Sequence, residues 1–180
     1  IQARQLHTAL ANDRLQGHIQ AQAIGANAVS FGADLRAFAG PEKNTTGLHW
    51  DKLLLQGQWQ AALWDIQSLD LQVADARVQG QFTFKPAQQA AQGQLQLSLP
   101  GLKAQAQGLL APEQGQGSAH IDISDAALSL AWLRRFPGWA ERLQSWQAAG
   151  AGQLHAQWQG GFQQNQTPVQ LNVSLPRLFY

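Results

Sequence analysis

The chain has 180 residues, of which 44% are hydrophobic and 13% charged, and its formal net charge is +1. This length suits a single domain, and because the charged fraction lies well below the roughly 25% of ordinary soluble domains, 30 glutamines supply much of the polar surface. Lysines and arginines are scattered, with Arg134-Arg135 the one adjacent pair, which excludes the basic stripe of a nucleic-acid-binding protein. The lack of cysteine excludes disulfides, thiolate nucleophiles and thiolate metal sites.

Apolar and polar residues alternate from the start of the chain, and this period of two predicts β-strands. We expect a first hairpin over 4–23 with a turn at Asn12-Asp13, then a strand over 29–37 and a loop over 40–47. No run approaches the roughly eighteen consecutive apolar residues of a membrane-spanning helix. Because residue 1 already lies inside an alternating pattern, we expect the chain to be a segment of a longer protein.

One short motif, an apolar residue followed by Gln-Gly-Gln, occurs three times, at 55–60, 78–83 and 91–96. The glycines of this motif occupy the alternate positions that otherwise carry apolar side chains, and several other glycines of the chain do the same. Glycine weakens a strand, so its repeated use indicates either points where the sheet bends or a trough left open for a guest molecule. Both interpretations apply to Gly17, Gly57, Gly80, Gly93, Gly117 and Gly152.

The middle of the chain keeps this alternation but changes its parity. Odd positions from Leu53 to Leu63 are apolar or glycine, and the apolar parity becomes even at Ala74-Asp75-Ala76, which marks a turn or a bulge. The count of alternating segments predicts roughly nine to eleven strands. The later ones are expected at 93–99, 102–108, 115–123, 154–158 and 169–175.

A different pattern interrupts the strands at about 125–147. Apolar residues recur there at spacings of three and four, which predicts an amphipathic helix. Asp125 or Ser124 can cap it, and Pro137-Gly138 is expected to kink it or split it in two. The spacing of Trp132, Trp139 and Trp146 places them on one helical stripe, where they either pack the helix on the apolar face of the sheet or contact a membrane surface. The chain is thus predicted to be a single all-β domain over 1–180 with one helical insertion.

The sequence offers no residues for catalysis. It contains no nucleophile elbow, phosphate loop or dinucleotide fingerprint, and no histidine has a metal-ligand spacing to a second ligand. We therefore predict that the protein is not an enzyme and holds no cofactor and no metal. The five histidines, which read as polar surface residues, are His7, His18, His49, His120 and His155.

Repeated strands of the form apolar-x-Gly-x-apolar, rich in Gln and Ala, resemble the AsmA-like family of Gram-negative bacteria, which includes the TamB-type proteins. The stretch from Leu130 to Trp139 looks like a helical interruption in the middle of such a protein. The resemblance implies a long, antiparallel-rich curved sheet that forms an open groove or an incomplete barrel. Its apolar lining would include Trp59, Leu63, Leu71, Phe82, Phe84, Leu95, Leu97 and Ile121.

The resemblance also implies a function. Proteins of this family are anchored in the inner membrane and extend through the periplasm, where the groove shields phospholipid during transport to the outer membrane and supports outer-membrane protein assembly. Their outer-membrane partner is of the Omp85 type (TamA), and it binds parts of the parent protein outside this segment. Two alternatives remain open: a scaffold that pairs its strands with outer-membrane protein clients, and a small outer-membrane barrel.

Overall fold

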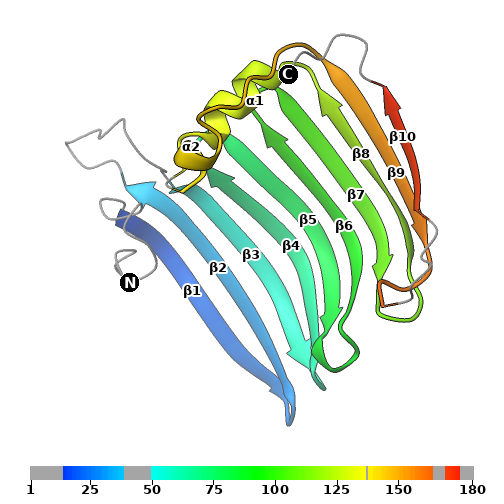
Figure 1. Ribbon diagram of the computed structural model, residues 1–180. Helices are drawn as coiled ribbons and strands as arrows, with labels where there is room; N and C mark the ends of the chain where they lie inside the picture. The colour runs from blue at the N-terminus through cyan, green and yellow to red at the C-terminus, as the bar shows by residue number, and fades with distance from the viewer. Residues whose placement is uncertain (1–13, 39–49, 137, 164–168, 175–180) are drawn as a thin grey trace.

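A computed structural model of the protein describes residues 14–38, 50–136, 138–163 and 169–174. Ten strands form one antiparallel sheet, and each strand pairs with its neighbours in the sequence. Figure 1 shows the strands side by side in chain order in a bent sheet with two separate edges. The strands are Arg14–Gly25 (β1), Ala28–Phe38 (β2), Trp50–Gln60 (β3), Leu63–Val73 (β4), Ala76–Lys85 (β5), Ala90–Leu99 (β6), Leu102–Leu110 (β7), Gln116–Ile123 (β8), Gly152–Gln159 (β9) and Val169–Ser174 (β10).

The predicted fold class is confirmed. The protein is mostly β, its single sheet is antiparallel, and within the described ranges β1 does not meet β10 to close a barrel. The first half of the predicted N-terminal hairpin and the loop over 40–47 lie outside the described residues, as do His7 and His49.

Tight turns join most of the strands, and two of them fall where the sequence marks a break. Ala74 and Asp75 connect β4 to β5 with φ values of 49° and 72°, so the change of parity noted there is a turn. Pro100 and Gly101 connect β6 to β7, and Gly101 has φ +80°, the conformation that a type II turn requires after proline. A 3-10 turn at Pro86–Gln88 (η3) lies between β5 and β6.

A bulge in β4 changes the parity a second time, which the sequence pattern did not reveal. Ile66 pairs with Phe82, but Leu69 pairs with Gly80, so β4 has one extra residue there. A bulge of this kind keeps apolar side chains on one face when their spacing in the sequence shifts by one. The apolar side of β4 therefore carries Trp64 and Ile66 and then changes to odd positions.

The prediction that Leu63 shares a face with Trp59 is wrong. Leu63 pairs with Gln60, whereas Trp64 pairs with Trp59, and directly opposed residues of an antiparallel pair point to the same side. The error arose because the odd parity was extended through the turn. Ala61 and Ala62 form that turn, with φ values of 47° and 64°, so the parity reverses on the return strand.

The predicted helical insertion is confirmed as two short helices, Ala126–Leu133 (α1) and Trp139–Arg142 (α2). Asp125 caps α1, because its Oδ1 accepts hydrogen bonds from the backbone N–H of Ala127 (2.9 Å) and Leu128 (3.1 Å). Gly138, with φ +84°, is the N-cap residue of α2. Trp132 and Trp139 thus lie on different helices and Trp146 lies on neither, so no single stripe of tryptophans forms. Neither described helix has the length and apolar character needed to cross a membrane.

The helices lie across the strand ends at one end of the sheet (Figure 1), which we call the helix end. Ser129 Oγ donates to Pro100 O (3.0 Å) in the β6–β7 turn, and Trp132 Nε1 donates to Ala74 O in the β4–β5 turn. Trp132 is 9% exposed. The helical segment therefore packs on two turns and closes the helix end.

Candidate functional site

One face of the sheet is lined by apolar residues from edge to edge, and we call it the apolar face. Two rows of directly paired residues cross all ten strands, and every position in them is apolar or glycine. The rows are Ile19, Ala33, Leu55, Leu69, Gly80, Leu95, Ala106, Ala119, Ala156 and Leu171, and Gly17, Leu35, Leu53, Leu71, Val78, Leu97, Ala104, Ile121, Leu154 and Val173.

Seven of the eight residues predicted to line a groove lie on this face. Leu71, Leu97 and Ile121 belong to the second row, and Leu95 belongs to the first. Trp59 and Phe84 both pair with Trp64, and Phe82 is opposite Gly93. Leu63 is on the other face. Pairing thus brings residues from five strands onto one surface, although none of the sequence patterns fixed how the strands are ordered.

Much of the apolar face is open to solvent. Among the described residues, only eight apolar side chains are buried, and most of these lie in the helical segment or at the strand ends. Large side chains of the face are instead between 38% and 62% exposed, because no second layer of described residues packs against it. They are Ile19, Trp64, Phe84, Leu95, Leu110, Leu171 and Val173.

The space beside the strand glycines is filled by the chain itself. A Cβ atom on Gly57 would lie 2.8 Å from Cζ of Phe31, and one on Gly80 would lie 2.7 Å from Cδ2 of Leu95. Backbone carbonyls of neighbouring strands would be closer than 3 Å as well. The glycines therefore let neighbouring strands and side chains approach closely, which supports the interpretation as bends rather than as gaps left for a guest.

Trp158 is the clearest example of this packing. A Cβ atom on Gly117, its directly paired neighbour, would lie 2.1 Å from Cζ2 of the indole. The ring reaches across the strands, because its Nε1 donates to Leu109 O at 3.1 Å. Gly117 thus makes room for the indole on the apolar face.

The opposite face, which we call the glutamine face, is polar. Glutamines alternate with the apolar residues on β5, β6, β7 and β9. The three described histidines lie on this face as the sequence predicts: His18 pairs with Asp34, and His120 pairs with His155. The two imidazole centroids of that pair are 6.1 Å apart. No group of three His, Cys, Asp or Glu side chains within the described residues is arranged to hold a metal ion.

One charged cluster lies on the glutamine face, and sequence reasoning missed it. Asp70 is only 8% exposed; it accepts two hydrogen bonds from Arg77, at 2.8 and 2.9 Å, and one from Lys52 Nζ at 2.8 Å. The Arg77 hydrogen bonds, together with Lys52, lower the pKa of Asp70 from 3.8 to about 2 although burial opposes this shift. The signal in the sequence is that all three residues have the polar parity on consecutive strands.

Acid should weaken this cluster. The Asp70 carboxylate has a lower pKa in the folded chain than in the unfolded chain. Its contribution to the free energy of unfolding is therefore complete above about pH 4 and is lost as the pH falls toward 2. We expect a loss of about 1 to 2 kcal/mol, reduced because Arg77 and Lys52 remain partly solvated. Urea denaturation of the wild type and of Asp70→Asn between about pH 4 and pH 2 measures this loss of stability. A stability difference between them that stays constant with pH would contradict the assignment.

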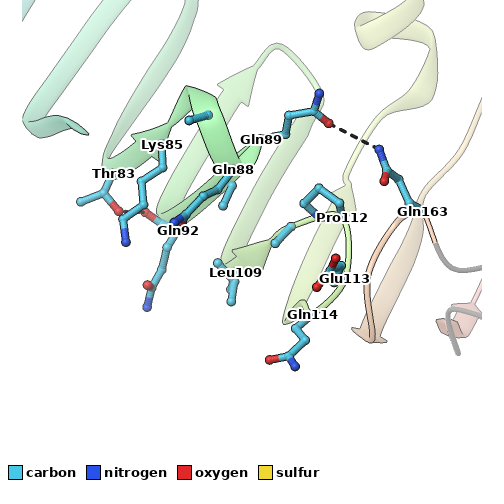
Figure 2. A pocket seen from close by; sticks show the side chains of 13 residues that line it. Thr83, Lys85, Gln88, Gln89, Gln92, Leu109, Pro112, Glu113, Gln114 and Gln163 are labelled. Atoms are coloured by element: carbon cyan, nitrogen blue, oxygen red, sulfur yellow. Dashed lines mark hydrogen bonds between the residues drawn. The ribbon is translucent and has the colours of Figure 1, made fainter. Parts of the chain in front are cut away.

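A surface hollow of about 800 Å³ lies at the opposite end of the sheet from the helices, between the β5–β6 turn and the β7–β8 loop. Figure 2 shows Gln89 and Gln163 meeting across its rim, and their amides are 3.5 Å apart. Its strand residues Thr83, Gln92 and Leu109 pair with one another on the glutamine face. The hollow is therefore separate from the apolar face, and neutral polar groups dominate its lining.

The arrangement of the apolar face is suited to binding apolar chains and offers no reacting group. Its paired rows form a wide hydrophobic surface from β1 to β10, with the helical segment across the strand ends. Comparisons with protein-family models, with curated proteins and with solved structures find nothing that matches this chain.

Proposed function

We propose that this chain is a segment of a periplasmic β-groove that shields the acyl chains of phospholipid in transit between the inner and outer membranes, and so supports outer-membrane protein assembly. The observation that carries the proposal is the pair of unbroken apolar rows across ten strands, with no layer of described residues covering them. Monomeric proteins rarely expose so large an apolar surface unless it binds something.

Shielding an acyl chain requires only apolar contact. Each methylene group withdrawn from water contributes about 0.8 kcal/mol, so the rows around Leu95 and Leu97 would stabilise a bound chain without a catalytic group or a cofactor. Continuous rows also let a chain move from strand to strand without crossing a polar position. The glutamine face keeps the other side of the sheet hydrated, largely through neutral amides.

The cellular setting belongs to the same proposal. The repeated apolar-Gln-Gly-Gln strands and the helical interruption resemble the AsmA-like and TamB-type proteins, and on that basis we place the parent protein in a Gram-negative bacterium, anchored in the inner membrane. Its outer-membrane partner would be an Omp85-type protein (TamA) that contacts parts of the parent outside this segment.

A second candidate function rests on the sheet edges. Natural edge strands often carry charged residues or proline, which prevent further pairing. β10 has neither. A scaffold that adds the strand of an outer-membrane protein client to this edge would use backbone hydrogen bonds rather than the apolar rows.

The experiment compares lipid content in matched variants of one strand. The chain is purified from a bacterial periplasm without detergent, and native mass spectrometry with lipid extraction measures bound phospholipid. Leu95→Asp with Leu97→Asp places two charges on the apolar face, because both residues belong to the paired rows. Gln94→Asp with Gln96→Asp places the same charges on the opposite face of the same strand.

We expect phospholipid to accompany the wild type and the glutamine variant, and to be lost from the leucine variant while its circular dichroism remains that of a β-sheet. Lipid-free wild-type protein that also fails to take up added phospholipid would refute the shielding function. Client binding by such a protein would favour the edge-pairing scaffold instead.

A further inference from the structure

Helix α1 is apolar on its outward side as well as on most of its buried side. Ser129 is the one polar residue of α1, and it lies on the buried side, where its Oγ donates to Pro100 O. The outward side of α1 is apolar, because Ala127, Leu128 and Ala131 are exposed. The glutamine face of the sheet is polar, as expected for a surface in water. The apolar outward side of α1 differs from it and does not serve solubility.

Two tryptophans extend this apolar exterior. Trp139 is 51% exposed and Trp146 is 63% exposed, whereas Trp132 in the same segment is buried. Leu128, on α1, is 52% exposed. Tryptophan is seldom left in water on this scale, and it is enriched where a protein surface meets the headgroup region of a bilayer.

The backbone that presents Trp146 is fixed in place. Arg134, at the end of α1, donates two hydrogen bonds to Leu143 O, at 3.2 and 2.9 Å, and another to Trp146 O. Leu143 is buried, so the stretch after α2 is attached both by these hydrogen bonds and by packing. The exposed indole of Trp146 is thus held outward by a built structure.

Arg142 supplies the positive charge that an anionic headgroup would meet. The helical segment carries Arg134, Arg135 and Arg142, and Asp125 at its N-cap and Glu141 oppose them. Arg134 is used within the segment, and Arg135 pairs with Asp75 at 3.0 Å. Arg142, three residues after Trp139, is exposed, so it is available to an anionic lipid headgroup.

From these observations we propose that the helix end of the sheet docks on an anionic phospholipid bilayer, with Trp139, Trp146 and Leu128 entering the interface and Arg142 contacting headgroups. The docking surface lies at the strand ends, beside the two rows of the apolar face. The contact itself needs no lipid bound to the apolar face, so it stands or fails separately from the shielding function.

Vesicle co-sedimentation tests the proposal. The wild type should bind vesicles of phosphatidylcholine mixed with phosphatidylglycerol, and bind less to phosphatidylcholine alone. Trp139→Ala with Trp146→Ala should lower binding to the mixed vesicles by on the order of tenfold, and Arg142→Gln should remove most of the preference for the anionic lipid. Gln144→Ala with Gln147→Ala, in the same segment, should leave binding unchanged.

The absence of cysteine from the chain allows a site-specific readout. An environment-sensitive fluorophore on Gln147→Cys should shift to the blue on mixed vesicles, and the same fluorophore on Gln94→Cys, on the glutamine face, should not. Equal shifts at both sites, or undiminished binding by the double tryptophan variant, would overturn the proposal. So would a concentration-dependent dimer that needs both tryptophans and forms without vesicles, because the surface would then bind a second copy of the chain.

Discussion

Replacing Trp132 by alanine should lower the free energy needed to detach α1 from the strand ends by about 3 kcal/mol or more. The indole is 9% exposed, its Nε1 donates to Ala74 O, and it packs edge-on against Phe136 with ring centroids 4.6 Å apart. The substitution removes that burial and leaves the Ala74 carbonyl without its indole donor. Hydrogen exchange at the α1 amides measures the change, because it reports both local and global opening.

Trp146→Ala is the matched control for this prediction. Trp146 belongs to the same segment but is 63% exposed, so its removal should change protection by less than about 0.5 kcal/mol. Equal losses in the two variants would show that α1 is not held at the strand ends by Trp132.

Adding a side chain at Gly117 should destabilise the sheet by about 3 kcal/mol. A Cβ atom there would lie 2.1 Å from the Trp158 indole and 2.4 Å from Gln107 O. Neither group can move away cheaply, because the first is a ring held by its hydrogen bond to Leu109 O and the second is backbone. Urea denaturation of Gly117→Val, followed by circular dichroism, measures the loss.

Two controls separate crowding from a general effect of valine in a strand. Gly25→Val introduces the same side chain where the nearest atom, Cβ of Ala28, is 3.7 Å from the new Cβ, and it should be nearly neutral. In a Trp158→Ala background the cost of Gly117→Val should fall, because the ring has been removed. An unchanged cost in that background would contradict the assigned contact.

The strands could be predicted from the sequence because one face is apolar and the other polar. Alternation with a period of two locates the strands and the side chains that share a face, and it places seven of the eight predicted lining residues on the correct face. It fails at Leu63, because the two-residue turn at Ala61 and Ala62 reverses parity without any glycine or asparagine to mark it. It also misses the bulge between Ile66 and Leu69, where the apolar spacing changes by one within a strand.

Contacts between distant residues could not be predicted in this way. Asp70, Arg77 and Lys52 meet because of the register of three strands, and period-two patterns carry no information about register. Similarly, the spacing of seven between tryptophans predicts a shared stripe only if one helix is continuous. The segment divides into α1 and α2, so Trp132 is buried while Trp139 and Trp146 are exposed.

The central claim is that phospholipid lies on the apolar face, and photo-crosslinking tests it most directly. A photoreactive phenylalanine analogue is placed singly at Leu95, Leu97, Gln94 or Gln96 of β6, and the chain is irradiated in the periplasm before the cells are opened. Mass spectrometry of the purified protein then identifies phospholipid adducts. Our account predicts adducts at Leu95 and Leu97 and few at the two glutamines. Adducts at all four positions alike, or at none of them in a chain that retains its β-sheet circular dichroism, would contradict it.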